Sequence, residues 1–509
     1  MTLLQRFCLF IYSLLLLGIL CCPAQPVAAQ SILRWSPQQQ IPGYFDKTLP
    51  PYLVADQNRT VHALTSQRFG EGNAGEVVIL YSRWTVAGGW TEPVDVLISP
   101  LYEARLMGVF LDSTGILHVL FFGGNDNGAT MYYATAAAAN ADKATAWSAP
   151  LPIGDNAITP SIAALVGDDK GHLVVVYNGN LGEGNSLYAV TSSDNGATWT
   201  TPNLVWSTYS SEFWPSDLAL EYGASGQIHA VWNYVDKQGK NVTGFYANLQ
   251  SSEAVQWSEP VELDKSLGLG IAAPSVKEYQ GEVFVLFNNG VTDGGAPALW
   301  VRRTADSGQS WSHALRAFAS HVGRNGAAAM VVDSNDGLHI FFGQRTRQGK
   351  EDIHGMWHSR LQRGMWSEVQ PLVSGPLVQS TDDSAFDPGD ARAVVSQGNV
   401  LLVTWRTDPG NGANGVWYSF AQIEAPALPV VPLPVPLAMI TPTPTPISTP
   451  TPNPTLAPTP TPILVAFETG QAASVNGVNK AAAPLLAGLV PVIMLITSIF
   501  VVTKSRRTQ

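Results

Sequence analysis

The octapeptide Ser192-Ser193-Asp194-Asn195-Gly196-Ala197-Thr198-Trp199 returns later in the chain as Thr304-Ala305-Asp306-Ser307-Gly308-Gln309-Ser310-Trp311. In both copies a glycine follows two short polar residues, which permits a backbone with positive φ. The aspartate can accept hydrogen bonds from the N–H groups of such a turn, and the tryptophan is a large apolar side chain that fits between two sheets. The pattern therefore predicts two structural turns, defined by Ser192, Asp194, Gly196 and Trp199 and by Thr304, Asp306, Gly308 and Trp311.

Degenerate copies of this octapeptide keep its tryptophan. Tryptophans 35, 90, 147, 199, 257, 311 and 366 follow one another at intervals of 52 to 58 residues. An interval of this length holds four short strands and their turns, which is one blade of a β-propeller. In the third repeat we expect strands at 161–166, 172–177, 186–191 and 203–206. Equivalent first strands begin near Tyr52, Arg105, Ser161, Ser216, Ser275, Ala327 and Arg392, which predicts seven blades.

The last repeat, residues 390–423, supplies only three strands before the composition changes. The missing fourth strand is available at the other end of the domain, where residues 35–41 contain a tryptophan but have no repeat of their own. Pairing the two ends would close the ring and leave no exposed sheet edge. We therefore predict an all-β, seven-bladed propeller over residues 30–423, closed by its N-terminal strand.

Both ends of the chain have the composition of targeting segments. Residues 1–29 combine Arg6, an apolar run and the small-residue ending Val27-Ala28-Ala29, which is typical of a secretory signal peptide. Cys8, Cys21 and Cys22 all lie in this segment, so we expect no disulfide and no cysteine metal site in the mature protein.

At the C-terminus, residues 481–503 form an uncharged stretch of 23 residues, followed by the basic residues of the tail 504–509. This pattern predicts one transmembrane helix with its tail in the cytoplasm. Residues 424–480 between propeller and helix are rich in proline and threonine, and we expect an extended stalk and a juxtamembrane linker. The predicted location is a single-pass cell-membrane protein with its propeller outside the cell.

The charge of the chain excludes one class of partner. Only 13% of the residues are charged and the net charge is −11, so a basic surface for nucleic acid is not expected. Histidines 62, 118, 229 and 339 recur at the second strand of their repeats, where the symmetry of the ring holds them apart. We interpret them as structural, and we predict neither a metal nor another cofactor.

The starts of the inner strands bring two arginines to the mouth of the predicted channel. Repeats seven, one and two are neighbours in the closed ring, so Arg392, Tyr52 and Arg105 are expected to lie together. Two guanidinium groups beside a tyrosine can clamp a carboxylate, and Arg324 is a candidate third arginine. Trp214 is a candidate platform for a sugar ring. The alternative is that Arg105 and Arg392 form inter-blade ion pairs with Glu103 and Asp390.

The repeated octapeptides, known as Asp-boxes, give residues 31–425 a resemblance to the bacterial neuraminidase-repeat family, which contains sialidases and non-enzymatic relatives. Sialidases of this family look like six-bladed propellers, so six blades is the alternative to seven. The resemblance implies three arginines that bind a carboxylate, a tyrosine nucleophile paired with a glutamate, and an aspartate as acid or base. Tyr52, Glu212 and Asp217 are the residues that could take these catalytic roles.

Three functions remain open on the sequence. The first is a monomeric, membrane-anchored propeller that recognises a glycan or glycoprotein at the cell surface. The second is an exo-α-sialidase-type glycoside hydrolase, and the third is a protein-interaction scaffold without a small ligand.

Overall fold

The computed structural model describes residues 33–44, 48–69, 76–101, 103–125, 128–154, 161–182, 184–249, 256–263, 270–289, 298–323, 326–348, 351–376, 386–407 and 415–433. All of them belong to the first of two compact units, Met1–Met439. The predicted signal peptide, the predicted membrane helix and its tail lie outside these residues. Among the residues described, none forms a helix of the length and apolar character needed to span a membrane.

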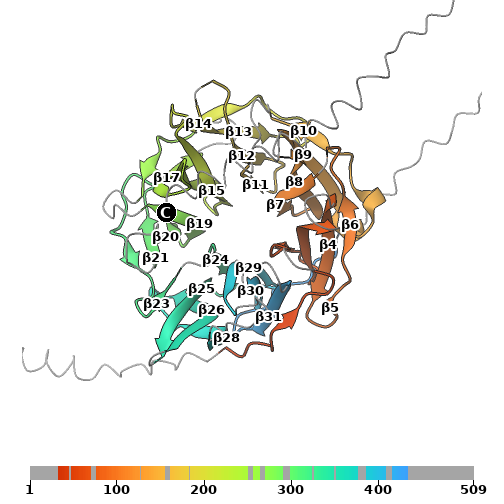
Figure 1. Cartoon of the computed structure of the whole chain (residues 1–509). Helices are drawn as coiled ribbons and strands as arrows, with labels where there is room; N and C mark the ends of the chain where they lie inside the picture. The colour runs from red at the N-terminus through yellow and green to blue at the C-terminus, as the bar shows by residue number, and fades with distance from the viewer. Residues whose placement is uncertain are drawn as a thin grey trace, which may run out of the picture. The chain divides into compact units, whose positions relative to one another are not determined.

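The described strands form seven antiparallel sheets arranged in a ring (Figure 1). We number these sheets as blades 1 to 7 in chain order. Blade 1 contains β2 (Tyr52–Ala55), β3 (Val61–Phe69), β4 (Glu76–Thr85) and β5 (Gly89–Trp90), with β6 (Val94–Leu97) also paired to β4. Blade 2 contains β7 (Glu103–Leu111), β8 (Ile116–Asn125), β9 (Gly128–Ala137) and β10 (Leu151–Ile153), with the 3-10 turns η2 (Ala138–Asn140) and η3 (Ala144–Ala146) before β10.

The next three blades each have four strands. Blade 3 contains β11 (Ala163–Gly167), β12 (Leu173–Gly179), β13 (Ser186–Ser192) and β14 (Asn203–Ser207). Blade 4 contains β15 (Phe213–Tyr222), β16 (Ile228–Asp236), β17 (Asn241–Leu249) and β18 (Val261–Glu262). Blade 5 contains β19 (Ile271–Tyr279), β20 (Glu282–Asn289), β21 (Leu299–Thr304) and β22 (Leu315–Arg316).

The last two blades complete the ring. Blade 6 contains β23 (His321–Val322), β24 (Ala329–Val332), β25 (Leu338–Gln348), β26 (Glu351–Gln362), β27 (Met365–Trp366) and β28 (Gln370–Pro376). Blade 7 contains β29 (Pro388–Ser396), β30 (Val400–Thr407), β31 (Val416–Gln422) and, from the other end of the chain, β1 (Gln39–Gln40).

The ring closes where the sequence predicts. β1 pairs antiparallel with β31, with Gln39 opposite Tyr418. On either side of this pair, the N–H groups of Ser36 and Ile41 donate to the carbonyls of Phe420 and Val416, both at 2.8 Å. Seven blades and closure by the N-terminal strand are therefore confirmed, and the six-bladed alternative is wrong.

The blades are buried on both faces because each lies between two neighbours. In β12, Val174 and Val176 pack towards blade 4, whereas Leu173 and Val175 on the opposite face pack towards blade 2. The alternation of side chains along a strand thus supplies two apolar faces from one β-branched run. Every pair of neighbouring blades, including blades 7 and 1, shares such a buried cluster.

The repeated tryptophans pack between neighbouring blades, which explains their regular spacing along the sequence. Trp199 of blade 3 packs edge-on against Tyr133 of blade 2, with ring centroids 5.2 Å apart. Trp311 of blade 5 makes the same contact with Tyr246 of blade 4 at 5.0 Å. Each indole therefore joins a blade to the third strand of the blade before it, which is an inter-sheet role of the kind that the sequence predicts.

The described part of the predicted stalk, residues 424–433, contacts the propeller. The Leu428 N–H donates to the Gln397 carbonyl at 2.8 Å, and the Val431 N–H donates to the Gln57 carbonyl at 3.0 Å. Leu433 then packs against the cluster shared by blades 1 and 2. The chain thus follows the turns that join first and second strands from blade 7 to blade 1.

Candidate functional site

The two Asp-box octapeptides form the same hydrogen-bonded turn. Asp194 Oδ1 accepts from the Ser192 hydroxyl at 2.7 Å and the Thr198 N–H at 2.9 Å. Hydrogen bonds from the Thr198 hydroxyl and N–H and from Ser192 lower the pKa of Asp194 to about 2. The carboxylate is therefore ionised and already bonded within its own turn, which suits a structural role and leaves little capacity for chemistry.

The second copy repeats this geometry. Asp306 Oδ1 accepts from the Thr304 hydroxyl at 2.7 Å and the Ser310 N–H at 2.8 Å, and the pKa of Asp306 is also lowered to about 2. The Trp311 indole N–H donates to the Gly308 carbonyl at 3.1 Å, and Gly308 has φ +91°. The glycine is required because a Cβ there would lie 2.4 Å from the Tyr246 ring.

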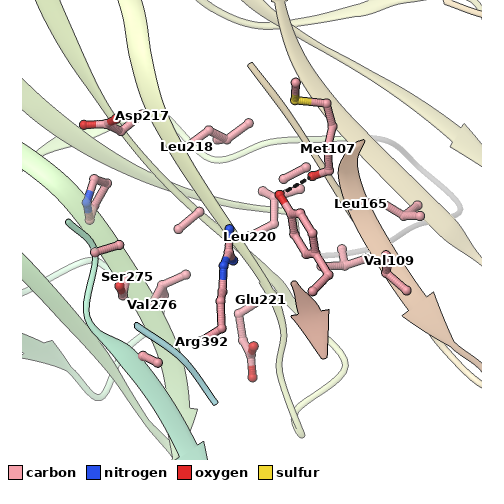
Figure 2. A pocket seen from close by; sticks show the side chains of 18 of the residues that line it. Met107, Val109, Leu165, Asp217, Leu218, Leu220, Glu221, Ser275, Val276 and Arg392 are labelled. Carbon is pink, nitrogen blue, oxygen red and sulfur yellow. Dashed lines mark hydrogen bonds between the residues drawn. The ribbon is translucent and has the colours of Figure 1, made fainter. Parts of the chain in front are cut away.

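The inner strands enclose a cavity of about 1010 Å³ along the axis of the ring (Figure 2). All seven blades contribute to its wall, mostly with small or apolar residues. Seven lining residues carry a carboxylate or a cationic group: Asp168, Asp169, Asp217, Glu221, Lys277, Asp390 and Arg392.

Most of these charges are engaged with the protein. Lys277 forms an ion pair with Glu221, and the Arg406 Nε donates to Asp390 Oδ2 at 3.0 Å. Burial raises the pKa of Glu221, an effect that the neighbouring ammonium of Lys277 opposes. Because the cation and the carboxylate of each pair compensate each other, these groups offer little free charge to a ligand.

Arg392 is different, and it lies where the sequence predicts. Its guanidinium carbon is 4.3 Å from the centroid of the Tyr52 ring, so blades 7 and 1 meet here through a cation–π contact. The Tyr52 hydroxyl donates to the Met107 carbonyl of blade 2 at 2.8 Å, the bond drawn in Figure 2. Arg392 is exposed to the cavity, and none of the carboxylates that the structure describes lies within ion-pair distance of it.

Asp217 lines the cavity but holds blades 4 and 5 together. Its N–H donates to Asn233 Oδ1 at 2.7 Å, and its Oδ2 accepts from the Ala273 N–H at 2.9 Å and from Asn233 Nδ2 at 3.2 Å. Asn233 also donates to the carbonyl of Ile271 in blade 5. The carboxylate accepts two of these bonds, so it is fixed in position and serves the inter-blade contact.

The other predicted site residues lie away from Arg392. Glu212 forms an exposed ion pair with Lys237 at 2.5 Å, and neither Glu212 nor the half-buried Trp214 lines the cavity. Arg324 lies outside the described residues.

Arg105 pairs with Glu103, but both residues lie in β7, so this ion pair does not join two blades as the alternative interpretation expects. The Nε of Arg105 is 3.8 Å from Glu103 Oε2, Glu103 also pairs with Arg68 of blade 1, and Arg105 does not line the cavity. The corresponding pair in blade 7 is different from the one we expected, because Asp390 binds Arg406 and leaves Arg392 to stack on Tyr52.

A β-bulge positions Arg392, and the sequence does not reveal it. The inner strand of blade 7 shifts register between Gly389 and Arg392, and Asp390 within the shift has φ +54°. Equivalent shifts occur in β15 before Leu218 and in β19 before Ser275. The extra residue re-aims the side chain that follows, as bulges next to binding sites often do.

The four recurring histidines are structural elements with a carboxylate on one side. His62 bonds Asp56 through Nε2 at 3.2 Å and the Tyr81 hydroxyl through Nδ1 at 2.7 Å. His118 repeats this with Asp112 and Tyr133. In both blades the aspartate precedes the histidine by six residues, a spacing that is visible in the sequence.

Blade 4 obtains the same arrangement from its neighbour. His229 bonds Glu278 of blade 5 at 3.2 Å and the Tyr246 hydroxyl at 2.8 Å. Gly223 stands six residues before His229, where the aspartate is found in blades 1 and 2. A Cβ at Gly223 would lie 1.7 Å from Glu278 Oε2, so the missing side chain leaves room for the carboxylate of the next blade.

Comparisons with known proteins place the chain among distant structural relatives. No family model and no curated protein matches it. Similar structures include an ulvan lyase of polysaccharide lyase family PL25 bound to -[GlcA(1-4)Rha3S]-, with 13% identity, a TM-score of 0.49, and 76% of this chain and 97% of that chain covered. A protein of unknown function from Dyadobacter fermentans DSM 18053 has 12% identity and a TM-score of 0.46, covering 77% of this chain and 99% of that chain.

The Hadza microbial sialidase Hz136 is a further similar structure, with 11% identity and a TM-score of 0.40 over 77% of this chain and 95% of that chain. Identities this low carry no information on the role of any single residue in this chain.

Proposed function

We propose that the propeller binds an anionic glycan, or a glycoprotein that carries one, in its central channel through Arg392. The observation that carries this proposal is the exposed guanidinium, stacked on Tyr52 at 4.3 Å and without a carboxylate partner among the described residues. A guanidinium held by one face keeps its N–H edge free for a bidentate bond to a carboxylate or sulfate. A cavity of about 1010 Å³ has room for the terminal sugars that bear such a group.

Binding is better supported than hydrolysis. The Tyr52 hydroxyl donates to a backbone carbonyl, and Asp217 is bonded to Ala273 and Asn233. Glu212 pairs with Lys237 outside the cavity lining. A nucleophile needs an adjacent base, and an acid needs to reach the leaving group. These three residues, which the resemblance to sialidases suggests for catalysis, do not share such a geometry.

The proposed setting of this activity is the cell surface. It is supported by the sequence alone, through the signal-peptide pattern of residues 1–29 and the uncharged stretch 481–503 with its basic tail. A propeller displayed in this way would meet glycans of other cells or of the surrounding matrix.

The test is a binding titration of the full chain in a mild detergent. Sialyllactose, a glucuronate-terminated disaccharide and sulfated lactose are compared with neutral lactose. We expect at least one acidic sugar to bind more tightly than lactose, and Arg392→Ala to weaken it by about 10- to 100-fold, since a hydrogen bond to a charged group contributes about 1.5–3 kcal/mol.

Arg303→Ala is the matched control, because Arg303 is an exposed arginine whose partner, Glu282, lies at 3.2 Å on the outer part of blade 5. It should leave the affinity unchanged. Equal affinity for acidic and neutral sugars, or an unaltered affinity in Arg392→Ala, would contradict the proposal. Release of free sugar that Tyr52→Phe abolishes would replace binding by hydrolysis, and the absence of any sugar binding would favour a protein-interaction scaffold.

A further inference from the structure

Blade 6 departs from the histidine–tyrosine arrangement of blades 1, 2 and 4. Its histidine, His339, bonds Asp333 through Nε2 at 2.9 Å, as in blades 1 and 2. On the other side, where Tyr81, Tyr133 and Tyr246 stand in blades 1, 2 and 4, the Nδ1 of His339 meets Nε2 of His358 at 2.8 Å. Two imidazoles are thus joined in the interior of the blade.

The hydrogen bonds assign the protons of this pair at neutral pH. The carboxylate of Asp333 can only accept, so His339 Nε2 carries a proton and its Nδ1 is an acceptor. A tyrosine hydroxyl donates to that nitrogen in blades 1, 2 and 4, and His358 Nε2–H does so here. A tyrosine hydroxyl does not gain a proton near neutral pH, whereas a histidine in an ordinary environment takes up a second proton near pH 6.5. His358 can therefore become positively charged, and the tyrosines at this position cannot.

The surroundings of the pair oppose such a proton. The titratable and charged groups around His358 are His339, Asp333 and Arg360, while Arg34 on the adjacent N-terminal segment is exposed. Asp333 already pairs with the Arg360 guanidinium. Among the described residues, Asp56 and Asp112 in blades 1 and 2 have only their histidine as an ionic partner. If the histidine pair of blade 6 gains a proton, its positive charge must share Asp333 with Arg360. In blades 1 and 2, Asp56 and Asp112 would each be available to neutralise a charged histidine.

His358 also supports the closure of the ring. The indole of Trp35 packs edge-on against it, with ring centroids 5.6 Å apart, and against Phe341 at 5.8 Å. The Leu33 N–H donates to Gln370 Oε1 in the same blade at 3.3 Å. Residues 33–41 are thus held by blade 6 at their start and by β31 of blade 7 at their end.

We propose that residues 33–41 are an acid-sensitive clasp, which protonation of the His339–His358 pair releases from the seam between blades 6 and 7. The charge would lie beneath Trp35, and moving the segment aside would admit water to it. This device is independent of whether the channel binds a glycan.

The burial of His358 determines whether the closed clasp becomes more or less stable as the pH falls. Burial, the His339 ring and Arg360 hold the pKa of His358 well below its ordinary value. The pair is therefore neutral while the clasp is closed and takes up a proton when it opens. Stability of the closed clasp is full above about pH 6.5 and falls as the pH drops below that value, by about tenfold in the open-to-closed ratio per pH unit.

Hydrogen exchange of the full chain, followed by mass spectrometry at pH 7.5, 6.5 and 5.5, tests the clasp. We expect the protection factors of peptides from residues 33–41, corrected for the intrinsic exchange rate, to fall about tenfold between pH 7.5 and 5.5, with most of the fall below pH 6.5. His358→Tyr introduces the side chain that three other blades use, and His358→Gln keeps an N–H donor that does not titrate. Both variants should remove the fall.

His229→Gln is the control, because it changes a buried histidine at the seam of blades 4 and 5 and should leave the fall at residues 33–41 intact. If His358→Tyr does not fold, His358→Gln gives the answer by itself. Protection that does not change with pH in the unaltered chain, or a fall of the same size in the His358 variants, would overturn the proposal.

Discussion

The turn face of the propeller and its central channel use charged residues in opposite ways. The turn face comprises the turns after the first and third strands of each blade, and the Asn195 N–H of one Asp-box donates to the Gly171 carbonyl of the neighbouring turn at 3.0 Å. Asp56, Asp333 and Asp194 on this face are all bonded to nearby protein donors. In the channel, Arg392 stacks on the Tyr52 ring, and none of the described carboxylates forms an ion pair with it. A charge whose hydrogen-bonding capacity is used within the fold stabilises that fold, whereas the guanidinium of Arg392 is the basis of the ligand site proposed above.

Removal of a carboxylate from the turn face should have the largest effect on stability. Asp333 is fully buried and binds His339, Arg360 and the N–H groups of Asn335 and Gly337. Asp333→Ala should lower the free energy of unfolding by about 3–5 kcal/mol, because it leaves the buried His339 and the largely buried guanidinium of Arg360 without their carboxylate partner. Denaturant unfolding measures the change. Arg392→Ala should stay within about 0.5 kcal/mol of the unaltered chain, and a cost similar to that of Asp333→Ala would end the distinction.

Blade 4 offers a second test of how carboxylates stabilise the turn face. Gly223→Asp restores the local aspartate of blades 1 and 2 but should be destabilising, since its Cβ would lie 1.7 Å from Glu278 Oε2. Adding Glu278→Ala removes this closest contact and leaves the new aspartate next to His229, whose Nε2 would lie 2.9 Å from the new Cβ. Unfolding of both single variants and the double variant should show a favourable coupling of about 0.5–3 kcal/mol. Additive effects would show that the carboxylates of the two blades are not interchangeable.

The smallest expected effect concerns the channel itself. Tyr52→Phe removes the hydroxyl that donates to the Met107 carbonyl but keeps the ring beneath Arg392. The free energy of unfolding should fall by about 1 kcal/mol, as for one buried hydrogen bond, while the affinity for an acidic sugar stays within about twofold. Thermal unfolding and a binding titration measure the two quantities. A large loss of affinity would mean that the hydroxyl, and not the guanidinium alone, contacts the ligand.

The fold could be predicted because its main determinant is a repeat. An indole at each blade interface, such as Trp199 on Tyr133, makes the interval between tryptophans a direct record of blade length. The shortfall of one strand at the C-terminus, and the surplus strand at the N-terminus, then determine how the ring closes. For the same reason, the meeting of Arg392 and Tyr52 follows from blade order alone.

The remainder of the site depends on features that a repeat does not record. The bulge before Arg392 shifts the strand register by one residue. Whether Asp390 pairs with Arg406 or with Arg392 depends on which of the two guanidinium groups lies within reach of its carboxylate. Glu212 shows the same limit, because its loop position near the fourth inner strand does not reveal that Lys237 lies within reach. In blade 4, Glu278 of blade 5 takes the place of the local aspartate. This replacement cannot be recognised from the sequence before the packing of the two blades is known.

The pairing of β1 with β31 has a consequence for synthesis of the protein. Gln39 and its partner Tyr418 are 379 residues apart in the chain. At about 5–20 residues per second, a ribosome needs on the order of 20 to 80 s to make the partner after the N-terminal strand has emerged. Before blade 7 is made, β1 lacks the partner strand that it has in the closed ring, so the ring can close only after synthesis of β31, and a nascent chain stopped short of blade 7 would remain an open arc exposed to proteases and chaperones.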